Sequence, residues 1–110
     1  MGLFSRKKSK AADTNTALLA RIDGRLIRYV TRRDTDENGS PRETVLGREG
    51  RIHVQPDYVA VSSNGKEVFR CTPEDVKCGE LMSLEGVVFT GINQLTGQMD
   101  TVVAYYKYYR

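Results

Sequence analysis

Few side chains in this sequence of 110 residues have the types and spacing that catalysis requires. Its single histidine, His53, lies in Ile52-His53-Val54, where strand alternation places it on the opposite face from two apolar neighbours. No glycine-rich phosphate loop, H-E-x-x-H or G-x-S-x-G motif occurs. Cys71 and Cys78 have six residues between them, which fits neither a zinc knuckle nor a redox motif, and we expect two reduced, partly buried thiols. The sequence therefore predicts a protein that is not an enzyme, with no catalytic residue, metal ligand or cofactor.

Arginines are the most concentrated charged residues, with eight between positions 21 and 51. On a strand, Arg28 and Arg32 project from the same face, about 13 Å apart at ~3.3 Å per residue. A guanidinium binds phosphate or carboxylate in a forked geometry, so Arg28, Arg32 and Arg33 are candidate ligands of an anion. The same segment holds six acidic residues, so cross-strand ion pairs on a solvated sheet face are the alternative interpretation.

Two short fragments are similar to motifs of PilZ domains, a family that binds cyclic di-GMP. The pairs Arg21-x-x-x-Arg25 and Arg28-x-x-x-Arg32 resemble that family's arginine pair. The segment from Leu81 to Gly86 resembles its D-x-S-x-x-G motif, with Leu81 in place of the acid. Since the missing acid would contact the ligand, we assign the chain to no family.

The C-terminal segment 102–109 is apolar on both faces where it begins and rich in tyrosine where it ends. A strand of this kind is either buried between layers or covered by a partner. Tyrosine presents a large rigid ring with a polar tip and is common at protein interfaces. The residues expected to make a protein contact are Tyr105, Tyr106, Tyr108 and Tyr109. The alternatives are a core and rim position, or stacking on the bases of a single-stranded nucleic acid.

The basic residues are unevenly distributed. The first ten residues hold four of the 17 basic side chains and no acid, which leaves a net charge of −1 for the remainder. A body so close to neutral argues against nucleic-acid binding. The tail could instead lie on an anionic membrane through Leu3, Phe4, Arg6, Lys7, Lys8 and Lys10, or simply act as a solubilising end. Because no secretory or membrane-spanning segment is recognisable, we expect a cytoplasmic protein, with peripheral membrane contact as the alternative.

Turn residues divide the rest of the chain into short strands. Asn64-Gly65 suits a type I′ hairpin turn, and the polar stretch 34–41 is the clearest loop. Gly47 and Gly50 predict a bulge or bend in the strand that returns from this loop, and Pro56-Asp57 predicts the next turn. Residues 16–22 could form a short helix ended by Asp23-Gly24, or a strand.

The last third of the chain predicts a short helix and two long strands. Thr72-Pro73 resembles a helix start, and Gly79 would end a helix of one or two turns. The two strands are expected over residues 81–92 and 99–109.

These features together predict a mainly β fold: a small antiparallel barrel or two-layer sheet of six to seven strands with one or two short helices. We expect a flexible basic tail over residues 1–16 and a single β domain over residues 17–110. The predicted function is a non-enzymatic interaction module that contacts a protein partner or a second copy through its tyrosine-rich last strand. A membrane-associated module and a binder of nucleic acid or another anion are the two alternatives.

Overall fold

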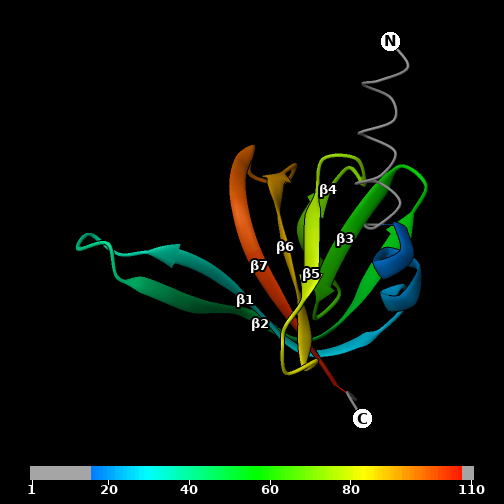
Figure 1. Cartoon of the computed structure of the whole chain (residues 1–110), viewed down its shortest axis with the longest axis horizontal. Coiled ribbons are helices and arrows are strands. Elements are labelled where there is room, and N and C mark those ends of the chain that lie inside the picture. Colours follow the sequence, from blue (N-terminus) through cyan, green and yellow to red (C-terminus); the bar gives the residue numbers. More distant parts are fainter. Residues whose placement is uncertain (1–15, 108–110) are drawn as a thin grey trace.

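The computed structural model describes residues 16–107, which form one curled antiparallel sheet and a short helical segment (Figure 1). The seven strands lie in the order β4-β3-β2-β1-β7-β6-β5 and curl into a half-barrel. Their bounds are β1 (Leu26–Thr35), β2 (Pro41–Gln55), β3 (Tyr58–Ser63), β4 (Lys66–Cys71), β5 (Lys77–Glu80), β6 (Gly86–Asn93) and β7 (Gln98–Tyr106). The expected mainly β, barrel-like fold with six to seven strands is confirmed.

Local turn signals in the sequence correspond to real turns. Asn64 and Gly65 both have positive φ, 55° and 82°, as a type I′ turn between β3 and β4 requires. Pro56-Asp57 separates β2 from β3, as predicted. A register shift opposite Val30 and Thr31 shows that β2 bulges next to Gly47, which confirms the expected irregularity.

Residues 16–22 are helical, which decides between the two alternatives left by the sequence. Leu19 and Ile22 are buried in the core, three residues apart on one face of the helix. Gly24 follows with a φ of 79°, a conformation that glycine adopts without strain and that turns the chain into β1.

The core fills the concave side of the half-barrel. Side chains from the helical segment and from the strands fill it, and Phe69 of β4 and Phe89 of β6 stack across it with ring centroids 6.0 Å apart. Tyr106 is only 1% exposed, so this tyrosine belongs to the core. Its hydroxyl donates a hydrogen bond of 3.0 Å to Glu80, and the guanidinium of Arg25 lies 3.8 Å from its ring centroid.

The predicted second helix is absent from the described residues, because the segment that follows Thr72 forms one turn and then a strand. The amides of Asp75 and Val76 both donate to the Thr72 carbonyl, at 3.1 Å, and no further helical bonds follow. Cys78 packs against the core, and its strand β5 pairs with β6. Tertiary packing therefore overrides the local helix-start signal, and Gly79 lies inside a strand.

The strand predicted over residues 81–92 is wrong in its first five residues. Leu84 has a φ of 64°, and its amide donates to the Leu81 carbonyl at 2.8 Å, so this segment reverses the chain between β5 and β6. The reversal follows from the antiparallel pairing of β5 with β6, which the many apolar residues between positions 81 and 92 do not indicate.

The open side of the half-barrel is closed along β4 by the β6–β7 turn. The Asn93 side chain accepts a hydrogen bond from the Arg70 amide at 3.2 Å and donates one to the Val68 carbonyl at 3.1 Å. The Gln94 amide adds a bond of 2.8 Å to the Arg70 carbonyl. These bonds occupy backbone groups that would otherwise form an unpaired edge at β4.

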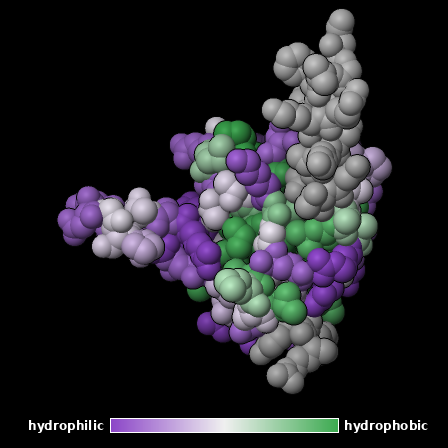
Figure 2. Space-filling model, viewed as in Figure 1, coloured by the Kyte–Doolittle hydropathy of each residue, from purple (hydrophilic) through white to green (hydrophobic). Residues whose placement is uncertain are grey.

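One hairpin extends away from this closed body. Strand β1 pairs with β7 only as far as Arg33, opposite Thr101, whereas its pairing with β2 continues to Thr35 opposite Pro41. Residues 34–42 therefore form a free two-stranded arm, which we call the arm (Figure 1). None of its residues is buried, and its surface is mostly hydrophilic (Figure 2).

Candidate interaction surface

The arm is fastened to the sheet by a polar cluster around Glu43, on the outer, convex face. The Glu43 carboxylate accepts a hydrogen bond from the Tyr105 hydroxyl at 2.7 Å and a second, short one from the Thr31 hydroxyl. The ring of Tyr29 stacks on Tyr105 with centroids 4.6 Å apart, and Arg33 lies 4.0 Å from the carboxylate. We call these five residues the clasp.

The clasp holds its carboxylate ionised and its phenol protonated. Burial raises the pKa of Glu43, but the hydrogen bonds from Thr31 and Tyr105 and the charge of Arg33 outweigh it, so the pKa lies below the ordinary value. Burial and the hydrogen bond to Glu43 together raise the pKa of Tyr105. Both shifts favour the protonation states that make the Glu43–Tyr105 hydrogen bond.

Exposed apolar side chains extend the outer face beyond the clasp. Ile92 and Met99 face each other across β6 and β7, and they are 47% and 63% exposed. Val45, opposite Thr31 on β2, is 54% exposed. The outer face of β2, β1, β7 and β6 therefore combines the clasp with apolar side chains that no described residue covers.

The four tyrosines expected at an interface have different positions. Tyr105 is half-buried on the outer face within the clasp, whereas Tyr106 is buried in the core and unavailable to a partner. Tyr108 and Tyr109 lie outside the described residues. Strand β7 lies between β1 and β6, so it has no free edge for pairing within the described part of the chain.

A free strand edge does exist on β2. Strand β3 pairs with β2 only from Gly50 onward, and two further bonds, from the Ser63 hydroxyl and the Asn64 amide, reach Arg48 and Glu49. Residues 41–47 of β2 pair with β1 alone within the described part of the chain. The unpaired edge thus runs from the arm to a groove beside the β3–β4 turn.

The three arginines proposed as an anion site are not together. Arg33 belongs to the clasp, and Arg32 lies near Asp34, whose pKa is lowered first by a hydrogen bond from Arg42 and then by the charges of Arg42 and Arg32. The cross-strand ion pairs of the alternative interpretation are present here, with Arg42 and Asp34 3.0 Å apart. Arg28 instead lines the groove beside the β3–β4 turn, which neither Arg32 nor Arg33 reaches.

That groove is basic and has an apolar floor. Four cationic side chains and one acid line it, together with Leu46 and Val68, and its volume is about 700 Å³. The charged residues are Arg28, Arg48, Lys66, Lys107 and Glu49. We call this site the basic groove. Arg48, Lys66 and Lys107 come from three separate segments, so their meeting in one groove could not be predicted from the sequence.

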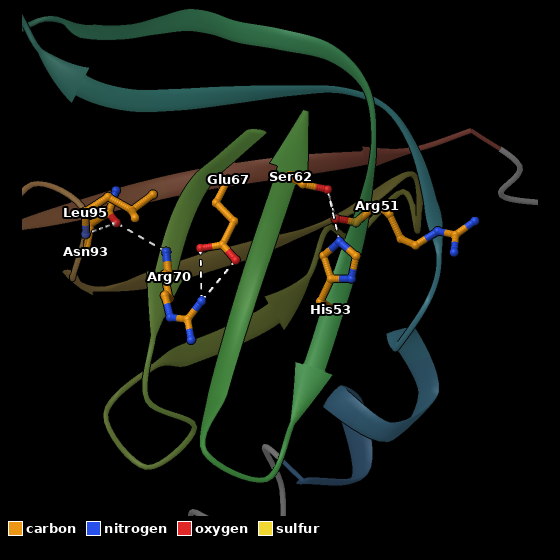
Figure 3. A network of polar contacts seen from close by, with 7 residues as sticks. All are labelled: Arg51, His53, Ser62, Glu67, Arg70, Asn93 and Leu95. Carbon is orange, nitrogen blue, oxygen red and sulfur yellow. Dashed lines mark hydrogen bonds and ion pairs between the residues drawn. The ribbon is translucent and has the colours of Figure 1, made fainter. Parts of the chain in front are cut away.

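A serine and the histidine meet on the outer face of β2 and β3, where Figure 3 shows a chain of polar contacts. His53 Nε2 lies 3.1 Å from Ser62 Oγ, and this hydroxyl donates to the Arg51 carbonyl at 3.3 Å. A serine nucleophile needs its proton directed toward the histidine, whereas the Ser62 hydroxyl also has the Arg51 backbone carbonyl within hydrogen-bond distance. The contact therefore favours a structural role for the pair, as it does for the neighbouring Arg70–Glu67 ion pair of 3.0 Å.

The remaining predicted sites are described briefly. The tail residues Leu3, Phe4, Arg6, Lys7, Lys8 and Lys10 lie outside the described residues. Cys71 is buried and Cys78 half-buried, both are free thiols, and burial raises the pKa of each. Within residues 16–107, no cluster of histidine, cysteine and acidic side chains could hold a metal ion. In the same range, no helix has the length and apolar composition needed to cross a membrane.

Comparisons with known proteins identify no relative: no family model, curated protein or solved structure matches the chain. The fragments similar to PilZ motifs gain no support from this search.

Proposed function

We propose that this protein is a non-enzymatic interaction module that self-associates through the arm and the outer face beside Tyr105. The observation that carries the proposal is the arm itself: nine residues, 34–42, none of them buried against their own chain. Ordering residues costs about 1–2 kcal/mol each in backbone entropy, and burial within the chain does not offset that cost here. Burial against a second copy would offset it.

The unpaired edge of β2 supports the same proposal. Exposed strand edges pair readily with other strands, and proteins usually shield them. Every copy of the chain carries this edge, so two copies related by a two-fold axis can each supply hydrogen-bond partners for the other's unpaired backbone groups. Strand β7, the tyrosine-rich strand, contributes to this contact through Tyr105, whose hydrogen bond to Glu43 fastens the base of the arm to the sheet.

The test is sedimentation velocity over a wide concentration range, comparing the full chain with a variant that lacks the arm. Because Arg33 and Glu43 are direct partners, residues 34–42 can be replaced by Asn-Gly, the turn that the chain already uses between Ser63 and Lys66. We expect the full chain to associate and the shortened chain to remain a folded monomer.

Two results would contradict the proposal. A full chain that stays monomeric at every concentration would exclude self-association. Equal association of the full chain and of the variant without the arm would exclude the arm as the interface. Tyr58→Phe serves as a control, since Tyr58 lies outside the proposed interface and the described residues give its hydroxyl no hydrogen bond, so its removal should leave association unchanged.

A further inference from the structure

Three of the four cationic side chains of the basic groove form no ion pair within the described part of the chain. Arg28, Arg48 and Lys66 form no ion pair within residues 16–107, whereas Arg21, Arg33, Arg42 and Arg70 each have a carboxylate within 4.0 Å. With Lys107 and Glu49 included, the groove lining carries a net charge of +3. The chain from residue 11 onward has a net charge of −1, so this site concentrates positive charge against the trend of the body.

The groove also lies where an added segment could pair with the backbone. Leu46, Gly47 and Arg48 line it, and residues 41–47 of the same strand form the unpaired edge. An extended segment placed there would gain main-chain hydrogen bonds along β2 and side-chain contacts with the floor at Leu46 and Val68. The site therefore suits an acidic hairpin, one strand of which can pair with β2, better than a compact ligand.

The arm has the complementary charge. Its residues 34–38 include Asp34, Asp36 and Glu37 and no basic residue. Arg42 pairs with Asp34, while the Asp36 carboxylate caps the turn by accepting bonds from the amides of Asn38 and Ser40. Glu37 is exposed and its side chain forms no hydrogen bond or ion pair within residues 16–107, so it is available to a partner.

We propose that the basic groove receives the acidic arm of a second copy, an inference that rests on the self-association proposed above. The arm and the groove are different surfaces, so each copy can give its arm and accept its partner's. Reciprocal exchange around a two-fold axis closes the assembly as a dimer, whereas exchange in one direction alone would build open chains. Opposite charges on two surface elements also make the contact sensitive to salt.

The test is a charge-swap experiment with two variants. In the arm variant, Glu37→Lys with Asn38→Lys makes the arm basic. In the groove variant, Arg48→Glu with Lys66→Glu makes the groove acidic. All four side chains are exposed. The side chains of Asn38, Arg48 and Lys66 form no hydrogen bond or ion pair within residues 16–107, so their replacement should not disturb the fold. Far-UV circular dichroism and thermal unfolding check that each variant folds.

Like charges then meet in each variant alone, and opposite charges meet in an equimolar mixture at both contacts. We expect each variant alone to associate at least about tenfold more weakly than the unmodified chain, and the mixture to recover the dimer. Sedimentation velocity and native mass spectrometry measure both quantities. A fourfold rise in salt should weaken the unmodified dimer in the same assay.

Several results would overturn the inference. Variants that associate like the unmodified chain, or a mixture that stays monomeric, would exclude the groove as the receiver of the arm. If the mixture stayed monomeric while the unmodified chain associated and the chain without residues 34–42 did not, the proposed function would stand and only this inference would fail. A monomeric unmodified chain would exclude both. Association that disappears on nuclease treatment would identify nucleic acid, and not the arm, as the occupant of the groove.

Discussion

The clasp predicts a measurable energetic coupling between Glu43 and Tyr105. A hydrogen bond to a charged group is worth about 1.5–3 kcal/mol when buried. The Glu43 side chain is 36% exposed, so water replaces part of what is lost when the bond is removed. We therefore expect Tyr105→Phe to lower the free energy of unfolding by about 1 kcal/mol, which corresponds to roughly 5 °C in melting temperature for a domain of this size.

The assay is a double-mutant cycle in urea, with unfolding followed by circular dichroism and tyrosine fluorescence, since the chain has six tyrosines and no tryptophan. Glu43→Ala should cost more than Tyr105→Phe, because it removes the acceptor of the bond from Thr31 as well as that of the bond from Tyr105. The double variant should lose about 1 kcal/mol less than the sum of the single losses. Tyr29→Phe, which removes a hydroxyl from the same ring stack, is the control.

A coupling energy below about 0.3 kcal/mol would refute this reasoning, because the effects of substitutions at residues that do not interact add to within that amount. It would mean that the clasp does not hold the arm against β7. The orientation of the arm would then have to come from the β1–β2 pairing alone, and the outer face would lose its link to the arm.

Three further perturbations test the fold around the site. Tyr106→Phe should lower the free energy of unfolding in urea by about 1–2 kcal/mol, because the hydroxyl that it removes is buried and donates a hydrogen bond to Glu80. Gly50→Ala should destabilise by about 1–3 kcal/mol, since its Cβ would lie 1.7 Å from the Ser62 carbonyl oxygen; Gly79→Ala, with no atom within 4 Å, is the thermal-melt control. The pKa of Glu43 is lowered on folding, so its contribution to stability is complete above its ordinary value of 4.5 and is lost as the pH falls through the folded value. Urea midpoints measured from pH 7 to pH 3 should therefore fall less when Glu43 is replaced, and Asp34, whose pKa is also lowered, accounts for part of the fall that is left.

The sequence was informative where a single residue determines the local backbone. Asn64-Gly65 and Gly24 predicted their turns because positive φ is tolerated by few residue types. The short strand β5 was missed for the opposite reason. Thr72-Pro73 resembles a helix start, and only the packing of Cys78 against the core, which depends on distant strands, makes the segment extended.

The site was predictable only in part, because its parts are distant in sequence. Tyr105 and Tyr106 have the same residue type at adjacent positions, and alternation correctly places them on opposite faces. It does not say which face lies inside, since Val102 and Val103 are both fully buried. The arginine count likewise indicated a charged region but could not separate Arg33, which is paired within the clasp, from Arg28, which lines the basic groove.

The contrast between two strand edges supports the proposed assembly most directly. At β4 the edge is closed by Asn93, which is 2% exposed and forms bonds to Val68, Arg70, Leu95 and Asp100. A buried asparagine is costly unless its polar atoms are all bonded, so this closure depends on a specific arrangement. At β2, residues 41–47 have no such cover among the described residues, although they adjoin apolar side chains and three cations, Arg28, Arg48 and Lys66, that form no ion pair within residues 16–107. We infer that the chain shields the edge of β4 from pairing and leaves the edge of β2 available, and that the arm of a second copy supplies the missing cover.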